Sequence, residues 1–400
     1  MDTGSIWRLS SAGPSDRRGF LNQIRTGAEL NASTSHAIHS GQNPMKVFWR
    51  KLLLSVWIVA LSTTGADAQE GSDPKIIQAA RKEGEIVWYT TMSADQSTSF
   101  MERFQRKYTF LKPSIIRLGG NALLSRIVTE AKAGRSYFDV VHGTGEIVLP
   151  LMNMGLLASY VSPERKMIPE DLKDKKGFWT SVYVNSIVLG YNTNLTKGQP
   201  IPRSYDDLLQ PTWRGRKISV DSTYVTFLQG LSSAWGKDRA LDYLKKLSEQ
   251  EPVVMRGSTV RAQLAAAGEF PLVIAYANII QYLTEKGAPI DWVALEPAVI
   301  SVNTVMAGAK ASHSNAAKLF IDFTLSKEGQ EKLWDFQRIP SRGDVEPKPA
   351  RLFRGYKRHV VHPEEMQISM RRRSSTRKFS KRAKACKSAQ RAPSSRARNL

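Results

Sequence analysis

Residues 115–145 read IIRLGGNALLSRIVTEAKAGRSYFDVVHGTG, and this stretch decides the fold class. The stretch from Ile115 to Leu118, which is apolar except for Arg117, is expected to form a strand. After the glycine pair, Asn121 is expected to cap a helix whose apolar residues recur on one face. Residues 138–141 predict a second short strand, which stops at His142. Strand, helix and strand in this order predict a parallel sheet with helices on both faces.

The same alternation extends in both directions along the chain. Upstream, the pattern predicts a helix at 74–84, a strand at 85–91 and a helix capped by Ser97. Downstream strands are expected at 187–191, 217–221, 253–255, 271–276, 292–295 and 302–307. Downstream helices are expected at 205–209, 222–235, 237–251, 258–267, 277–282, 314–325 and 327–336. Because the pattern restarts after Tyr160, we expect two α/β lobes of comparable size.

Residues 45–68, MKVFWRKLLLSVWIVALSTTGADA, are typical of a secretory signal peptide. A basic head precedes the apolar run from Leu52 to Leu61, and the segment closes on small residues at Ala66 and Ala68. The alternatives are a core helix or a membrane anchor, but ten apolar residues are too short to cross about 30 Å of hydrocarbon. Gln69, not a cysteine, follows Ala68. We therefore expect a periplasmic protein secreted through a cleaved signal peptide, without a lipid anchor.

The net charge of +22 is concentrated outside the predicted globular part. Residues 368–400 hold twelve Lys or Arg and no acid, residues 1–44 carry +1 and residues 45–68 carry +2, which leaves +7 for residues 69–367. The one cysteine is Cys386. The globular part is therefore mildly basic, and it has no cysteine for a disulfide, a thiolate nucleophile or a metal.

Both ends of the chain depart from this picture. An export signal is read at the amino terminus, so we expect residues 1–44 to be a non-native upstream extension and Met45 to be the start, with a long leader as the alternative. The composition changes abruptly after Gln367, and we interpret residues 368–400 as a basic, disordered tail produced by a frameshift. The alternative is a basic arm for anionic polymers.

Loops at the carboxyl ends of strands are the expected place for a ligand in such a sheet. Six loops here carry hydroxyls, amides and glycines ahead of helices, which suits a polar or anionic small molecule. The candidate ligand-binding residues are Thr90, Thr91, Asn121, His142, Thr144, Asp221, Ser222, Arg256, Tyr276 and Asn278.

Each candidate has a structural alternative. Thr90, Asn121 and Ser222 also suit helix caps. Arg256 is either a surface residue or a clamp for a carboxylate or phosphate. His142 is the expected titrating group, or a hydrogen-bonded loop histidine. Tyr276 alternatively fills a wall of the site, and Asp139 is expected to make a structural hydrogen bond.

Enzyme motifs are absent from the sequence. It has no GxGxxG after a strand, no GxxxxGK[ST], no HExxH and no GxSxG. The histidines between 69 and 367 are at 142, 313, 359 and 362, none at metalloprotease spacing. We therefore predict no catalytic residues, no metal site and no cofactor.

Several longer motifs follow one another in the sequence: EIVWYTT, AKAGRSYFDVVHGTGEIVLPLMNMGLLASY, GYNTNL, SYDDLLQPTWRGRKISVDS, AAAGEFPLVIAYAN, AKLFIDFTLSKEGQEKLW and IPSR. Through them, residues 74–367 show a resemblance to the periplasmic solute-binding proteins of ABC importers, specifically the iron(III)-type group. It implies a two-lobed periplasmic binding protein type II fold, in which each lobe is a mixed sheet flanked by helices and crossover strands join the lobes. We assign residues 69–160 with 299–340 to lobe 1 and residues 161–298 with 341–367 to lobe 2.

The resemblance implies a monomeric receptor that captures a small polar or anionic solute between its lobes and delivers it to an ABC permease in the inner membrane. Ferric-binding relatives place a tyrosine pair where this sequence has Asn278 and Ile279, so the importer role is better supported than the metal. Tyr276 and Tyr282 take the place of the tyrosine pair only if the two sequences align in a different register. The alternatives are a ferric or metal-chelate receptor and a periplasmic enzyme on the same fold. A nucleic-acid binder, using the basic tail, is the option from a third class, and we predict no nucleic-acid partner.

Overall fold

The computed structural model describes residues 72–222 and 225–366. The chain divides into two compact units, 1–68 and 69–400, and every described residue belongs to the second. The predicted upstream extension, signal peptide and basic tail therefore lie outside the described residues.

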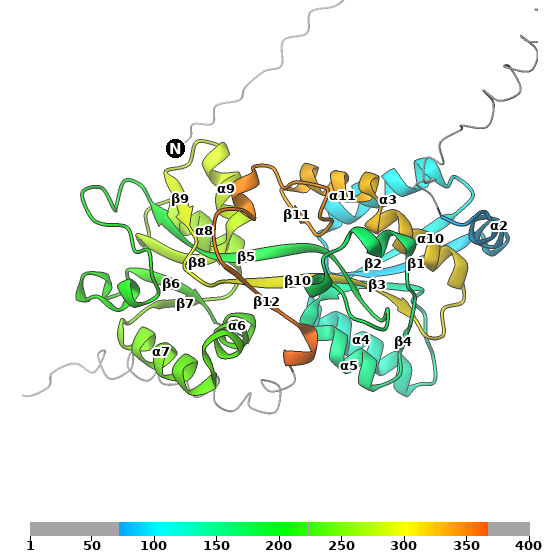
Figure 1. Ribbon diagram of the computed structural model, residues 1–400, viewed down its shortest axis with the longest axis horizontal. Coiled ribbons are helices and arrows are strands. Elements are labelled where there is room, and N and C mark those ends of the chain that lie inside the picture. The colour runs from blue at the N-terminus through cyan, green and yellow to red at the C-terminus, as the bar shows by residue number, and fades with distance from the viewer. Residues whose placement is uncertain (1–71, 223–224, 367–400) are drawn as a thin grey trace, which may run out of the picture. The chain divides into compact units, whose positions relative to one another are not determined.

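The described strands form one mixed sheet, ordered β2-β1-β3-β10-β5-β8-β6-β7 (Figure 1). Strands β1, β2 and β3 are mutually parallel, and so are β6, β7 and β8. The antiparallel pairs are the ones that involve β5 and β10, apart from β12, which runs parallel to β10. The strands are β1 Glu85–Thr90, β2 Lys112–Arg117, β3 Val140–Thr144, β4 Leu157–Ala158, β5 Thr180–Asn192, β6 Ile218–Asp221, β7 Val253–Met255, β8 Leu272–Tyr276, β9 Ile290–Val293, β10 Ala298–Gly308, β11 Ile339–Pro340 and β12 Arg358–Val361.

Helices cover both faces of the sheet. The α-helices are α2 Pro74–Glu83, α3 Ala94–Lys107, α4 Gly120–Lys132, α5 Gly145–Asn153, α6 Val225–Trp235, α7 Lys237–Glu249, α8 Ser258–Ala266, α9 Ala277–Glu285, α10 Ser314–Leu325 and α11 Lys327–Lys332. Short 3₁₀ turns are η1 Pro163–Met167, η2 Glu170–Leu172, η3 Asp206–Leu209, η4 Pro211–Trp213, η5 Leu333–Phe336, η6 Ala350–Leu352 and η7 Pro363–Met366. Around β1–β3, α4 and α5 lie on one side and α3, α10 and α11 on the other; around β6–β8, α6 and α7 oppose α8 and α9 (Figure 1).

Local sequence explains the boundaries of these elements. Helix α2 begins where the Asp73 carboxylate accepts the Lys75 N–H at 2.8 Å and Pro74 presets the backbone, and it ends at Gly84 with φ 70°. Two predicted caps were wrong. Helix α3 begins at Ala94 after Ser93, so Ser97 is a buried residue of its second turn, bonded to the Ala94 carbonyl at 3.0 Å.

The second wrong cap is Asn121. Helix α4 begins one residue earlier, at Gly120, with Gly119 in the capping position and no side-chain cap. Asn121 is exposed in the first turn. Glycine is an accepted residue at this position, and the preceding pair of glycines made the exact start ambiguous in sequence.

The strands β5 and β10 are longer than their apolar cores suggested. They span Thr180–Asn192 and Ala298–Gly308, whereas alternation predicted only 187–191 and 302–307. They pair with each other and carry the two parallel groups on opposite ends, since β3 and β4 pair with 303–308 of β10 while β8 and β9 pair with 187–192 of β5. We call β1–β3 with their helices the first half, and β6–β9 with theirs the second half.

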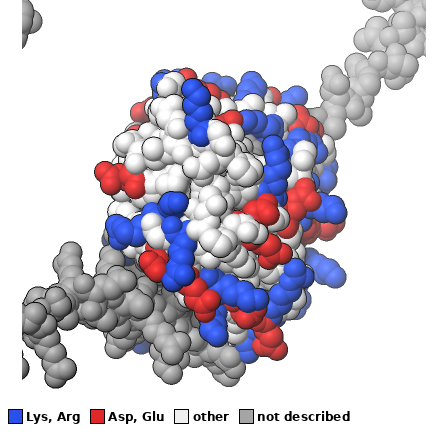
Figure 2. Space-filling view, turned by 90° about the vertical axis from the view of Figure 1, so that its left-hand side faces the viewer, with Lys and Arg blue, Asp and Glu red and all other residues white. Residues whose placement is uncertain are grey.

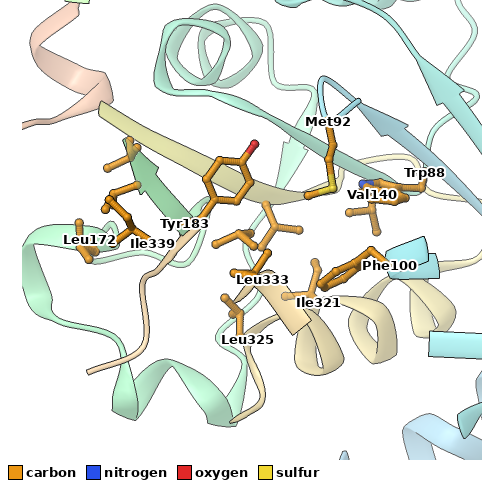
Figure 3. Close-up of a cluster of buried hydrophobic side chains, with 14 of the residues drawn as sticks. Trp88, Met92, Phe100, Val140, Leu172, Tyr183, Ile321, Leu325, Leu333 and Ile339 are labelled. Atoms are coloured by element: carbon orange, nitrogen blue, oxygen red, sulfur yellow. The ribbon is translucent and has the colours of Figure 1, made fainter. Parts of the chain in front are cut away.

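The largest apolar cluster, called the first core, includes residues of both halves, such as Phe320 and Val273, and a second core lies in the second half. In the first half, Trp88, Phe100 and Phe320 pack with ring centroids 5.0–6.3 Å apart. In the second half, Ile187, Leu231 and Leu272 belong to a separate cluster around α6 and α7. Tyr183 lies at the edge of the first core, and Figure 3 shows its hydroxyl turned away from Leu333 and Ile339. The buried polar residues that lie between the two cores therefore indicate where a ligand site is to be sought.

On the face drawn in Figure 2, Lys and Arg side chains are interspersed with Asp and Glu. This distribution agrees with the small net charge of residues 69–367. Within the described ranges, no helix combines the length and the apolar character needed to span a bilayer.

Candidate functional site

The crossing of β5 and β10 interrupts the apolar side chains with polar ones. Along the odd-numbered positions of β10, Val299 belongs to the second core, Ser301 and Asn303 follow, and Val305 belongs to the first core. All four are buried. On β5, Asn185 lies opposite Ser301. Polar groups at the center of a sheet occur where they have partners or a ligand, so this polar break marks the candidate site.

Two amide atoms in the break lack partners among the described residues. They are Oδ1 of Asn185 and Nδ2 of Asn303, on side chains 5% and 3% exposed. A buried polar atom without a hydrogen bond costs about 1–3 kcal/mol. The fold keeps both amides inside at this cost, as expected where a bound molecule completes their hydrogen bonds.

Strand ends of the first half supply Thr90 and His142. The Thr90 Oγ1 atom lies 3.1 Å from His142 Nδ1 and also accepts the Met92 N–H at 3.1 Å. Burial, reinforced by the positive charge of Arg338, lowers the pKa of His142 to about 3. The sequence predicted that His142 would titrate; in the structure it is buried and stays neutral at physiological pH.

Arg338 comes from the segment between η5 and β11. Its guanidinium carbon lies 4.8 Å above the ring of Tyr183, and Nη2 donates to Gln96 Oε1 at 3.0 Å. The Tyr183 ring in turn lies 5.4 Å from that of His142. Arg338 is partly buried and stacked, and its planar guanidinium is a group that suits contact with an anion.

Tyr276, at the end of β8, supplies a phenol on the second half. Its pKa is raised to about 12 because burial disfavours the phenolate and the carboxylates of Glu146 and Asp221 are near, while a hydrogen bond with Ser301 acts in the opposite direction. The Tyr276 side chain keeps partial access to solvent. Tyr276 is thus a neutral hydroxyl close to two acids.

Asp221 ends β6 and accepts the Gly257 N–H at 3.1 Å. The arginine that pairs with it is Arg261, at 3.3 Å, which also donates to the Ile274 carbonyl at 2.6 Å. Arg261 is 1% exposed, whereas the predicted clamp, Arg256, is exposed. Spacing alone did not distinguish these two arginines, five residues apart.

Helices α5 and α6 meet through a hydrogen bond between their first turns. Thr226 Oγ1 donates to Glu146 Oε1 at 3.1 Å. Helix α5 follows β3 of the first half and α6 follows β6 of the second, so this bond links the halves beside the polar break. It joins the positively polarised ends of both helices to one carboxylate.

The remaining candidates lie around these groups. Thr144 is the residue before α5, without a side-chain cap bond, and it lies opposite Asn303 on β10. The Thr91 N–H donates to the His142 carbonyl at 3.1 Å, and the Ser222 N–H to that of Met255 at 2.9 Å.

Two further candidates contrast in their surroundings. Asn278, in the first turn of α9, is 4% exposed and its Oδ1 has no partner among the described residues. Asn121 is exposed at the start of α4. The predicted structural role of Asp139 is confirmed, because its carboxylate accepts the N–H groups of Val87 and His313 at 2.8 and 2.9 Å.

The structure adds polar residues that the sequence prediction missed: Glu146, Tyr183, Asn185, Thr226, Arg261, Ser301, Asn303 and Arg338. A signal was present for part of this set, since Ser301 and Asn303 punctuate an otherwise apolar run. In the part of the chain that the structure describes, no three His, Cys, Asp or Glu side chains gather as a metal site would require.

The chain belongs to the family of bacterial extracellular solute-binding proteins, whose model matches residues 140–364. The fold is the two-lobed periplasmic binding protein type predicted, with the described strands joined in one mixed sheet flanked by helices. Its function is that of a substrate-binding component, which captures a small solute for import. The related proteins are binding proteins rather than enzymes.

The similar proteins differ in what they are reported to bind. The Fe(3+)-binding periplasmic protein of Serratia marcescens is 24% identical over 273 residues, which cover 64% of this chain and 78% of the relative. The periplasmic binding protein AfuA of Actinobacillus pleuropneumoniae, solved with fructose 6-phosphate, is 28% identical with a TM-score of 0.59, covering 67% of this chain and 88% of AfuA. Iron-bound HitA of Pseudomonas aeruginosa is 20% identical with a TM-score of 0.65, covering 74% and 99%, which supports the fold alone.

Proposed function

We propose that the protein is the periplasmic receptor of an ABC importer for a small organic anion of the sugar-phosphate class. The observation that carries this proposal is the polar break at the crossing of β5 and β10, where buried amides of Asn185 and Asn303 await partners. The fructose 6-phosphate complex of AfuA supports the class of solute. Hydroxyl-rich solutes suit a site that offers carboxylates, a phenol and amides.

The two halves act as the lobes of the receptor, with the predicted boundaries 69–160 with 299–340 and 161–298 with 341–367. Strands β5 and β10 connect them, so a rotation of one lobe against the other bends these strands beside the site. The Thr226–Glu146 hydrogen bond joins the lobes next to the solute and favours the closed arrangement. A solute that contacts both lobes stabilises closure by its differential affinity for the closed form.

A bare ferric ion is the weaker candidate. The positions of the ferric tyrosine pair hold Asn278 and Ile279, and an amide is a poor ligand for a hard cation. Arg338 adds a positive charge beside Tyr183 and His142. The pKa of Tyr276 is raised to about 12, so its phenol has to be deprotonated at a cost before it ligates.

Export through the segment 45–68, action as a monomer and handover to an inner-membrane permease complete the proposal. The periplasmic location of two similar proteins supports this setting. We assign the protein no catalytic residue and no nucleic-acid partner.

A thermal-shift screen of the purified protein tests the proposal. The probes are fructose 6-phosphate, glucose 6-phosphate, fructose, inorganic phosphate and ferric citrate. A solute present at 100 times its Kd stabilises the folded protein by about 2.7 kcal/mol, so the sugar phosphates are expected to raise Tm by several degrees. A rise in Tm with ferric citrate alone, lost in Tyr276→Phe, would replace this proposal with the ferric receptor.

A further inference from the structure

Four hydrogen-bond donors without partners lie around Tyr183. They are Trp88 Nε1, His142 Nε2, Asn303 Nδ2 and Arg338 Nε, each inaccessible and unpaired among the residues that the structure describes. Trp88 and His142 are each 2% exposed and Asn303 is 3% exposed. Buried N–H groups are normally paired, so a set of this size needs an explanation.

Contacts with Tyr183 and, for Trp88, with His142 place the donors close to one another. The rings of Trp88 and His142 have centroids 6.2 Å apart, and those of His142 and Tyr183 are 5.4 Å apart. Arg338 stacks on Tyr183, and Asn303 lies directly opposite Tyr183 in the β5–β10 pairing. In Figure 3 the indole nitrogen of Trp88 is on the edge of the ring turned toward Tyr183.

The hydrogen bonds of Thr90 favour one of the two tautomers of His142. The Thr90 oxygen already accepts the Met92 N–H, and its own hydrogen has His142 Nδ1 as acceptor at 3.1 Å. A neutral imidazole that accepts at Nδ1 carries its hydrogen on Nε2. His142 therefore presents an N–H donor toward the cluster.

The cluster is also cationic. Arg338 donates to the neutral amide of Gln96, and within residues 72–222 and 225–366 it forms no salt bridge with a carboxylate. The charge of Arg338 contributes to the lowered pKa of Asp95, a carboxyl on α3 that is fully exposed. Glu146 and Asp221 lie instead near Tyr276, at the other end of the polar break. The Arg338 end of the site therefore holds a cation without a salt bridge in the described part of the chain, whereas the Tyr276 end holds two acids, of which Asp221 is paired with Arg261.

We infer that the anionic group of the solute, a phosphate or a carboxylate, binds at the donor cluster of Trp88, His142, Asn303 and Arg338, and that Arg338 selects for its charge. The inference rests on the proposed function and adds an orientation to it. The uncharged hydroxyl part of the solute faces Tyr276, Glu146 and Asp221, which accept hydrogen bonds. An anion at that end would face the carboxylate of Glu146, which disfavours the reverse orientation.

Calorimetric titration of variants tests this orientation. Arg338→Gln removes the charge and keeps an amide, and Arg338→Lys keeps the charge without the planar fork. A charge-assisted hydrogen bond corresponds to about 10- to 100-fold in Kd, so Arg338→Gln is expected to weaken fructose 6-phosphate binding by that factor. Arg338→Lys should fall between it and the wild type. Arg354→Gln, an exposed arginine paired with Glu346, is the matched control and should bind like the wild type.

The choice of probes distinguishes a phosphate from a carboxylate as the bound anion. It also tests the anion site separately from the proposed class of solute. Fructose 6-phosphate against gluconate distinguishes phosphate from carboxylate, and fructose supplies the uncharged comparison. Fructose 6-phosphate or gluconate binding that Arg338→Gln leaves unchanged would overturn the anion site while the small-solute receptor stands. Binding of fructose as tightly as its phosphate would do the same. If the wild type binds none of the organic probes, the proposed solute class itself fails.

A crystal structure of the complex decides where the anion lies. Phosphate or carboxylate oxygens within hydrogen-bond distance of Arg338 and Asn303 support the inference. Ordered water alone at the four donors, with the anion elsewhere, overturns it.

Discussion

His142 should make the stability of the protein depend on pH in a defined window. In the fold its pKa is lowered to about 3, first by burial and then by the charge of Arg338, whereas an unfolded chain has a histidine pKa of about 6.5. A group whose folded pKa is depressed stabilises the protein above its unfolded pKa. That stability is lost as the pH falls from about 6.5 toward 3.

The size of the effect follows from the two pKa values. Lowering the pH from 7 to 5 protonates His142 in the unfolded chain and leaves it neutral in the fold, which costs about 2 kcal/mol of unfolding free energy. Few carboxylates titrate in this interval, so the histidine effect is separable from general acid denaturation.

Urea unfolding at pH 7, 6 and 5, followed by tryptophan fluorescence, measures this dependence. His142→Gln is expected to lose about 2 kcal/mol less than the wild type between pH 7 and 5, whatever its absolute stability. The matched control is His362→Gln, which replaces a partly exposed histidine beside Trp179. Equal losses in His142→Gln and wild type would refute a neutral, buried His142 and the donor assignment built on it.

Three further perturbations are expected to have specific outcomes. The side chain of Gln330 makes four hydrogen bonds of 2.9–3.1 Å to main-chain groups of three segments. Gln330→Ala should therefore lower the free energy of unfolding, measured in urea, by about 4 kcal/mol. The control Gln263→Ala, at an exposed position, should change it by no more than about 0.5 kcal/mol. Equal midpoints for these two variants would contradict the first expectation. A Cβ at Gly230 would come 2.3 Å from Val299 Cγ1, so Gly230→Ala should lower stability by about 1–3 kcal/mol, and a stability unchanged in differential scanning calorimetry would show that α6 shifts freely. In absorbance titration at 295 nm, Tyr276→Phe should lack one phenol that ionises near pH 12 in the wild type. The stability of the wild type should fall as the pH rises from about 10 to 12, because the phenol ionises first in the unfolded chain. If the phenol missing in the variant ionises near pH 10 instead, Tyr276 is in contact with water.

Much of the fold could be predicted because its signals are local. The strand and helix periods around residues 115–145 recur along the chain, and glycines such as Gly84 end helices where a left-handed residue is needed. These patterns depend on neighbours within a few positions. They were enough to predict two α/β halves and the loops, at the ends of β1, β3, β6 and β8, that face the site.

The exact caps and strand lengths were less accessible. The residue in the capping position of α3 is Ser93, four residues before the predicted cap at Ser97, because Ser93, Asp95 and Ser97 all suit a helix start. Strands β5 and β10 extend into polar residues, where alternation gives no strand signal because both faces are buried by distant segments.

By itself, the sequence determined the class of protein, the two α/β halves and the loops that carry hydroxyls and amides to the strand ends. The tertiary structure alone decided which of these groups meet. Asn303 lies opposite Tyr183 because β10 pairs with β5 across more than a hundred residues, and Arg338 reaches the same ring from a segment near the end of the described chain. Whether an arginine is a surface residue, as Arg256 is, or an uncompensated charge beside buried donors, as Arg338 is, depends on burial and on partners remote in sequence. A local sequence pattern gives neither the burial of a side chain nor its partners from distant segments.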